Sequence, residues 1–185
     1  MCKEVNIILI KMFLLVILLL VAVFMDFTSF KIKNRLILFG FILGAILRIY
    51  DMEWTSILDG FIGMVVPVII LLPFFLFRVL GAGDIKLFSV IGIFYGASFV
   101  LNSMLYSLFI AGLMSIFYLF KSKQFQARYE YFLLYMKTSY VKIKNRDGTI
   151  KDIAPYYDVS RDGYKGVIHY SIAIILAVVI QLLWK

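Results

Sequence analysis

Long apolar runs dominate this sequence and constrain its fold more than any other feature. A helix needs roughly 20 mostly apolar residues to cross the hydrocarbon core of a membrane, where each backbone N–H and C=O must be paired within the segment. Runs that approach this length lie at residues 7–25, 36–50, 56–77 and 167–184. Because 63% of the residues are hydrophobic and only 16% are charged, the chain is expected to be an integral membrane protein.

A further apolar stretch, residues 85–120, is too long for one span. Small and polar residues at 95–98 and at Asn102 permit a turn within it. We therefore divide the stretch into a fourth span at about 85–95 and a fifth at about 98–120.

The predicted fold is all-α, a polytopic membrane helix bundle of about six transmembrane spans. The run at 167–184 becomes the sixth span. We expect one membrane domain over residues 1–185, with a polar loop at about 121–166. No internal repeat supports a two-fold transporter architecture.

Basic residues are distributed unequally over the two sides of this bundle. With six spans both termini lie on the same side, and 15 of the 19 Lys and Arg residues fall on the other. The side richer in Lys and Arg is normally cytoplasmic. We therefore expect both termini outside, and Asp26, Asp84 and the polar loop at the cytoplasmic face. The same distribution explains the net charge of +8, so no nucleic-acid partner is expected.

The polar loop at about 121–166 interleaves basic residues with tyrosine and phenylalanine. Its first half, around 129–136, is compatible with an amphipathic helix on the anionic leaflet, with aromatic rings at headgroup depth. Membrane lipid would then be its partner. A solvated basic connector with no specific partner explains the same composition equally well.

The chain has 11 acidic residues, and solvation explains all but two of them. The explained ones lie in the N-terminal tail, in the polar loop, or on the outer connection and its edge, where Asp59 falls. The remaining two are Asp26, which ends the first span, and Asp84, which opens the fourth. Charged groups near a span are costly, so two acids at one boundary require a reason. Arg48, at a span end, is expected to be an anchor that snorkels to the interface.

Asp26 and Asp84 have the chemistry of an aspartic peptidase if they meet. Two carboxyl groups in a partly desolvated site cannot both ionise easily, so one keeps a proton while the other is a base. The ionised member takes a proton from the attacking water, and the protonated member donates toward the peptide carbonyl. The sequence does not assign these roles to individual residues. The scheme uses no metal and no cofactor, and Cys2, the only cysteine, offers no thiolate pair for zinc.

Two glycines precede the second acid in the segment Gly81-Ala82-Gly83-Asp84. Glycine adopts dihedrals closed to other residues and lets another backbone approach, so an extended substrate could come near Asp84. The alternative is a loop in which Asp84 only caps the helix that follows, a position where Asp is favoured. Taken alone, Asp26 would be an ordinary acidic residue that ends a span before a basic loop. The two acids are more informative together because the charge distribution puts them on one side.

These residues resemble the prepilin peptidases, which are integral membrane aspartyl peptidases with a Gly-x-Gly-Asp motif. The second family motif is matched by residues 81–86, which read Gly-Ala-Gly-Asp-Ile-Lys. The first is matched by Asp26 and Asn34 at their usual spacing, with Lys33 in place of the usual proline. Residues 168–173 also resemble the start of the last span in small Gram-positive members.

The resemblance implies cleavage of the short basic leader of prepilins or pilin-like proteins, at the cytoplasmic face of a prokaryotic plasma membrane. It implies that Asp26 and Asp84 are catalytic. Gly81, Gly83, Lys86 and Asn34 match motif positions and could serve the approach of substrate. Bifunctional members carry a methyltransferase region with paired cysteines that this sequence lacks. The expected activity is therefore that of a peptidase alone, like the small enzymes of tight-adherence pilus systems, and the oligomeric state is left open.

Two residues near these motifs have more than one interpretation. Lys86 could influence the acid pair or meet the substrate, or it could be a positive-inside anchor. His169, the only histidine, heads the last span. A structural or interfacial role is favoured for it, because the two-aspartate mechanism leaves it no necessary task.

Three other functions compete with this prediction. A small transporter or channel could use Asp26 and Asp84 to bind a cation or relay protons, but it predicts acids deeper within the spans. A noncatalytic assembly protein is disfavoured because both acids are present. A presenilin-type protease is disfavoured because the Gly-x-Gly-Asp motif begins a span at the boundary.

Overall fold

A computed structural model describes residues 2–29, 31–50, 54–76, 80–121, 133–134, 137 and 169–184. Within these ranges the chain is almost entirely helical and contains no strand. The prediction of an all-α fold is confirmed.

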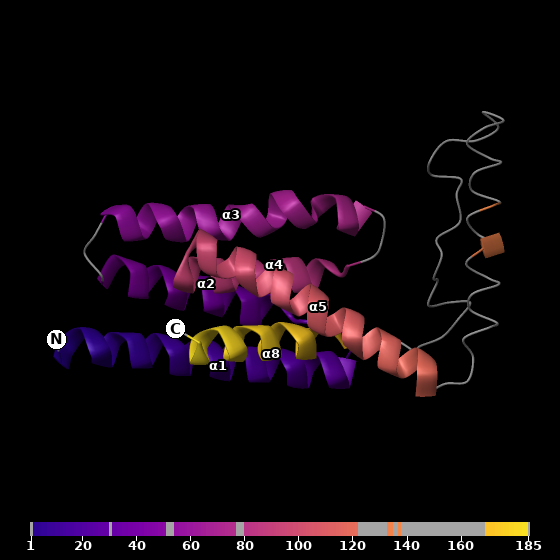
Figure 1. Cartoon of the computed structure of the whole chain (residues 1–185). Helices are drawn as coiled ribbons and strands as arrows, with labels where there is room; N and C mark the ends of the chain where they lie inside the picture. The colour runs from indigo at the N-terminus through magenta and orange to yellow at the C-terminus, as the bar shows by residue number, and fades with distance from the viewer. Residues whose placement is uncertain are drawn as a thin grey trace, which may run out of the picture. The chain divides into compact units, whose positions relative to one another are not determined.

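Six helices have defined bounds, and each corresponds to one of the six predicted segments (Figure 1). They are α1 (Cys2–Ser29), α2 (Asn34–Tyr50), α3 (Trp54–Leu76), α4 (Ala82–Tyr95), α5 (Ala97–Lys121) and α8 (Tyr170–Leu183). Three segments are long and apolar enough to cross a membrane, namely Leu9–Ser29, Trp54–Leu76 and Ala97–Tyr118. The chain is therefore a helical membrane protein.

The chain divides into two compact units, Met1–Ala111 with His169–Lys185, and Gly112–Ile168. All the residues discussed below belong to the first unit. In the second unit the structure describes the end of α5 and residues 133, 134 and 137. The predicted amphipathic helix lies mostly outside the described residues, and the single domain with a loop at about 121–166 stays a prediction.

The core of the first unit is built around α4. Most of this helix is buried, and its large side chains point into the bundle on every side. The helix has 14 residues, so at a rise of 1.5 Å per residue it is only about 21 Å long. The start of α4 lies near the start of α2, and its last turn lies near the end of α2. Its fully buried core residues include Leu87, Phe88, Val90 and Ile91.

Glycines set the packing and the end of α4. A Cβ added at Gly92 would overlap the carbonyl of Gly63, so α3 and α4 pack with their backbones in direct contact. Gly96 follows α4 with a φ of 90°, a backbone conformation that residues with a side chain rarely adopt. This residue allows the chain to turn between Tyr95 and Ala97, where the sequence predicted the division of the long apolar stretch.

A polar cluster joins α2 and α3 to the last turn of α4. Arg48 is 9% exposed, and its Nε and Nη1 donate to the carbonyl of Ile93 (2.8 Å) and to Ser56 Oγ (2.9 Å). Its Nη2 lies 3.6 Å from Asp59 Oδ2, while Asp59 Oδ1 accepts the N–H of Ala97 at 3.0 Å. The expectation that Arg48 snorkels outward is wrong, because its guanidinium satisfies acceptors inside the bundle.

Candidate active site

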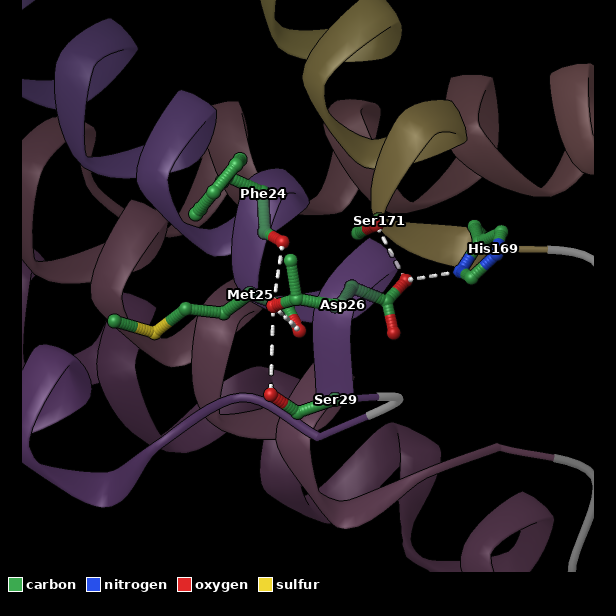
Figure 2. Close-up of polar contacts among 7 residues, drawn as sticks. Phe24, Met25, Asp26, Ser29, His169 and Ser171 are labelled. Atoms are coloured by element: carbon green, nitrogen blue, oxygen red, sulfur yellow. Dashed lines mark hydrogen bonds and ion pairs between the residues drawn. The ribbon is translucent and has the colours of Figure 1, made fainter.

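Asp26 lies in the last turn of α1 and is held by the first residues of α8 (Figure 2). The hydroxyl of Ser171 donates to Asp26 Oδ2 at 2.6 Å, and His169 Nδ1 lies 3.3 Å from the same oxygen. The His169 ring stacks on Phe27, with centroids 4.3 Å apart. Both partners of Asp26 thus come from a segment more than 140 residues away in the sequence.

The two oxygens of the Asp26 carboxylate differ in their surroundings. Oδ2 is engaged by α8, whereas Oδ1 accepts no hydrogen bond from the part of the chain that the structure describes. The neighbouring hydroxyl of Thr28 turns back to the carbonyls of Phe24 and Met25 and does not compete for the carboxylate. Among the described residues, only Oδ2 of Asp26 is therefore engaged.

Asp84 is the third residue of α4 and opens the buried part of that helix. Burial, together with the nearby negative charge of Asp26, raises the pKa of its carboxyl from 3.8 to about 7, while a hydrogen bond from the Gly81 backbone acts in the opposite direction. The two acids are therefore close enough for the charge of one to act on the other. At neutral pH a substantial share of Asp84 keeps its proton.

The first turn of α4 differs from the simplest capping interpretation. The N-cap residue is Gly81, with φ −76° and ψ 147°, and Asp84 sits three positions later. From that position its carboxyl reaches back to the Gly81 backbone, as an acidic residue does in a capping box. Asp84 is thus not the N-cap, although it does help to close the start of the helix.

The two motif glycines leave room and do not supply unusual dihedrals. Gly81 has an ordinary extended backbone, but a Cβ there would lie 3.2 Å from Asp84 Oδ2, a tight contact. A Cβ at Gly83 would lie 3.4 Å from Ile32, an ordinary contact. Gly81 therefore keeps space beside the carboxyl of Asp84, and Gly83 lies against the segment that follows α1.

Lys86 and Asn34, the other two predicted motif residues, contact each other. Lys86 Nζ donates to Asn34 Oδ1 at 2.9 Å on the exposed surface, and so ties the start of α2 to the first turn of α4. Among the described residues Lys86 forms no ion pair with Asp26 or Asp84. The turn before α2 forms without a proline, because the carbonyl of Lys33 accepts the N–H of Leu36 at 3.1 Å.

Sequence reasoning missed the role of α8 at this site. It included Tyr170 and Ser171 only as part of residues 168–173, which resemble the start of a last span, and gave His169 a structural or interfacial role without a partner. The structure puts His169 and Ser171 against Asp26. The Tyr170 hydroxyl lies 2.9 Å from Ser107 Oγ and within electrostatic range of Asp84. The available signal was topology, because the sixth span begins on the side where the first one ends.

The arrangement can support acid–base chemistry on a bound peptide. One carboxyl, on Asp84, is buried and readily holds a proton, while the other, on Asp26, presents an oxygen that accepts no hydrogen bond from the described residues. Two acids with these different surroundings can divide the roles of proton donor and base. No metal or cofactor is needed for that division.

Comparison with known proteins gives one match. The model of the type IV leader peptidase family matches residues 13–118, a region that includes Asp26, Asn34 and the whole segment from Gly81 to Lys86. Comparisons with curated proteins and with solved structures gave no match.

Proposed function

The chain belongs to the type IV leader peptidase family, and from this premise we propose that it is an aspartyl endopeptidase that removes the short basic leader of prepilins or pilin-like proteins. The observation that carries the proposal is the pair formed by Asp26 and Asp84. Asp84 is buried and lies near the charge of Asp26, which favours its protonated form, and neither acid forms an ion pair with a Lys or Arg among the described residues.

The surroundings of the two acids suggest how they divide the reaction. Asp84, with its raised pKa, retains the proton and donates it to the oxygen of the scissile carbonyl. Asp26 takes a proton from the attacking water, whose oxygen bonds to the carbonyl carbon. The tetrahedral intermediate collapses as the proton on Asp26 passes to the leaving nitrogen and the C–N bond breaks. Asp84 recovers its proton from the intermediate, so both acids return to their starting states.

The proposed cellular setting follows from charge and composition. With 15 of the 19 basic residues on the side of the polar loop, we place the acid pair at the cytoplasmic face of a prokaryotic plasma membrane and both termini outside. A basic leader held at this face would meet the site before its pilin crosses the membrane. We further propose peptidase activity without N-methyltransferase activity.

The test is cleavage of a pilin-like substrate, with a basic leader and a glycine before its apolar helix, by the full chain in membrane vesicles. Asp26→Asn and Asp84→Asn should each abolish release of the leader while the protein stays inserted and folded. Asp59→Asn is the matched control, because it changes an acid at the other end of α4 and keeps an oxygen for the N–H of Ala97.

Two results would contradict the proposal. Normal processing by either active-site variant would overturn the two-aspartate mechanism. Ion flux through the purified protein in liposomes, with no cleavage of any pilin-like substrate, would favour a transporter or channel instead.

A further inference from the structure

The beginning of α8 supplies every hydrogen-bond partner of the Asp26 carboxylate within the described residues. Ser171 is fully buried, and its hydroxyl donates to Oδ2 at 2.6 Å, the short distance typical of an O–H bonded to a carboxylate. His169 Nδ1, at 3.3 Å, donates to the same oxygen when it carries the proton. Stacking on Phe27 fixes the plane of the His169 ring.

These two partners stand on a rigid element. Immediately after Ser171, α8 enters the core through fully buried residues that include Ile174 and Val178. At its far end, Gln181 accepts a hydrogen bond from Ser103 of α5 at 2.7 Å. A carboxylate held from such a support keeps its orientation better than one held from a loop.

Asp84 is held in a different way. Its carboxyl accepts a hydrogen bond from the Gly81 backbone within its own helix turn, and no described side chain donates to it. Only Asp26 is therefore oriented by a distant part of the chain. Asp26 is the proposed base, and its Oδ1 must point at the attacking water. Support from a distant helix suits this task, because a small misplacement of a catalytic group greatly lowers the rate.

We propose that Ser171 and His169 are positioning residues that hold Asp26 through Oδ2 and so direct its Oδ1 to the water that attacks the peptide. The inference rests on the proposed function and goes beyond the two aspartates. Ser171 is the principal support, because its bond is the shorter and its side chain has no exposure to solvent. His169 is the second support, through its contact with the same oxygen at 3.3 Å.

The central test compares two serine-to-alanine variants in the leader-cleavage assay. Ser171→Ala should lower kcat about tenfold to hundredfold with KM nearly unchanged, because hydrogen bonds to charged groups are worth about that factor and Ser171 is fully buried. Ser103→Ala is the matched control, since it also removes one hydrogen bond that anchors α8, at the end distant from Asp26. It should keep wild-type kcat. Ser171→Thr retains the hydroxyl and should recover much of the lost kcat.

A second pair of variants tests His169. The Nδ2 atom of asparagine lies as many bonds from the backbone as the Nδ1 of histidine, so His169→Asn can still donate to Asp26 Oδ2. His169→Ala cannot. We expect kcat to fall several-fold in the alanine variant and to return largely in the asparagine variant, with thermal denaturation in detergent used to verify that both remain folded.

The outcomes separate this inference from the function on which it rests. If Asp26→Asn is inactive but Ser171→Ala and His169→Ala both cleave with wild-type kcat, the positioning role is overturned and the peptidase stands. If Ser103→Ala loses as much kcat as Ser171→Ala, the effect is general anchoring of α8, which also overturns the inference. If the wild-type chain cleaves no pilin-like substrate, the proposed function fails and the inference fails with it.

Discussion

The two ends of α4 each carry an aspartate cluster, and the clusters differ in how charge is balanced. At the last turn, Asp59 faces the guanidinium of Arg48 and accepts the N–H of Ala97. At the first turn, Asp84 is buried beside Asp26, and no Lys or Arg among the described residues pairs with either acid. At the last turn of α4 the acid lies opposite a basic group, whereas at the first turn two acids lie near each other.

This difference distinguishes a structural acid from a reactive one. Asp59 and Arg48 close the turn between α4 and α5, and their charges offset each other. Placing two acids close together in a buried site costs free energy that a purely structural contact would avoid. Groups whose pKa is shifted in this way are concentrated at functional sites. The following predictions test that contrast, beginning with the largest expected effect.

Substituting the acids one at a time should separate activity from stability most strongly. Asp84→Asn and Asp26→Asn are expected to reduce leader cleavage by at least about a thousandfold, because they remove the proton donor or the base. Asp59→Asn should keep activity and lower the thermal denaturation midpoint in detergent. A loss of activity in Asp59→Asn without a loss of stability would contradict the division between the two ends.

Removing Arg48 should lower stability and leave activity unchanged, the reverse of what is expected for the active-site variants. Arg48→Ala leaves the carbonyl of Ile93 without its donor and Asp59 without its partner, and the lost hydrogen bonds of the largely buried guanidinium cost about 1–3 kcal/mol. We expect a marked fall in the free energy of unfolding, measured in detergent, and normal kcat at temperatures where the variant is folded. Unchanged stability would show that the cluster is not a structural one.

The pH dependence of cleavage should report the proton on Asp84. Because burial and the charge of Asp26 raise its pKa to about 7, kcat/KM should fall about tenfold for each pH unit above that value as the proton donor is lost. The raised pKa also means that stability declines as pH rises from 3.8 to about 7. An activity that stays level from pH 6 to pH 9, with cleavage itself limiting, would contradict the assignment of Asp84 as donor.

The smallest effect is expected at the exposed link between the two motifs. Lys86→Met removes the hydrogen bond to Asn34, and an exposed bond of this kind contributes about 1 kcal/mol or less. Activity should change no more than a few-fold, as measured by leader release at saturating substrate. A loss of activity comparable to that of Asp84→Asn would indicate that Lys86 takes part in the reaction. Asn34→Ala is the control, because it removes the same hydrogen bond and keeps the lysine.

Several parts of the site were accessible from the sequence and others were not. Asp26 and Asp84 stood out because the sequence assigned every other acid to a solvated position, and the family match covers both. Asp59 was among those other acids, and it proves to bind Arg48 and the N–H of Ala97. The place of Asp84 in its helix was predicted only approximately, since the N-cap turned out to be Gly81. Arg48 was misjudged because its acceptor, the carbonyl of Ile93, lies 45 residues away and carries no sequence signal.

The apolar runs by themselves determined that this chain forms helices in a membrane, because an apolar solvent leaves the backbone only itself to bond with. The Gly-x-Gly-Asp segment and the first aspartate determined the family. Only the tertiary structure decided that the start of α8 closes over Asp26, that Lys86 bonds to Asn34, and that Arg48 turns inward to Asp59. Hydrophobic patterning fixes which segments are buried, but it does not specify which polar side chains face one another once the helices pack.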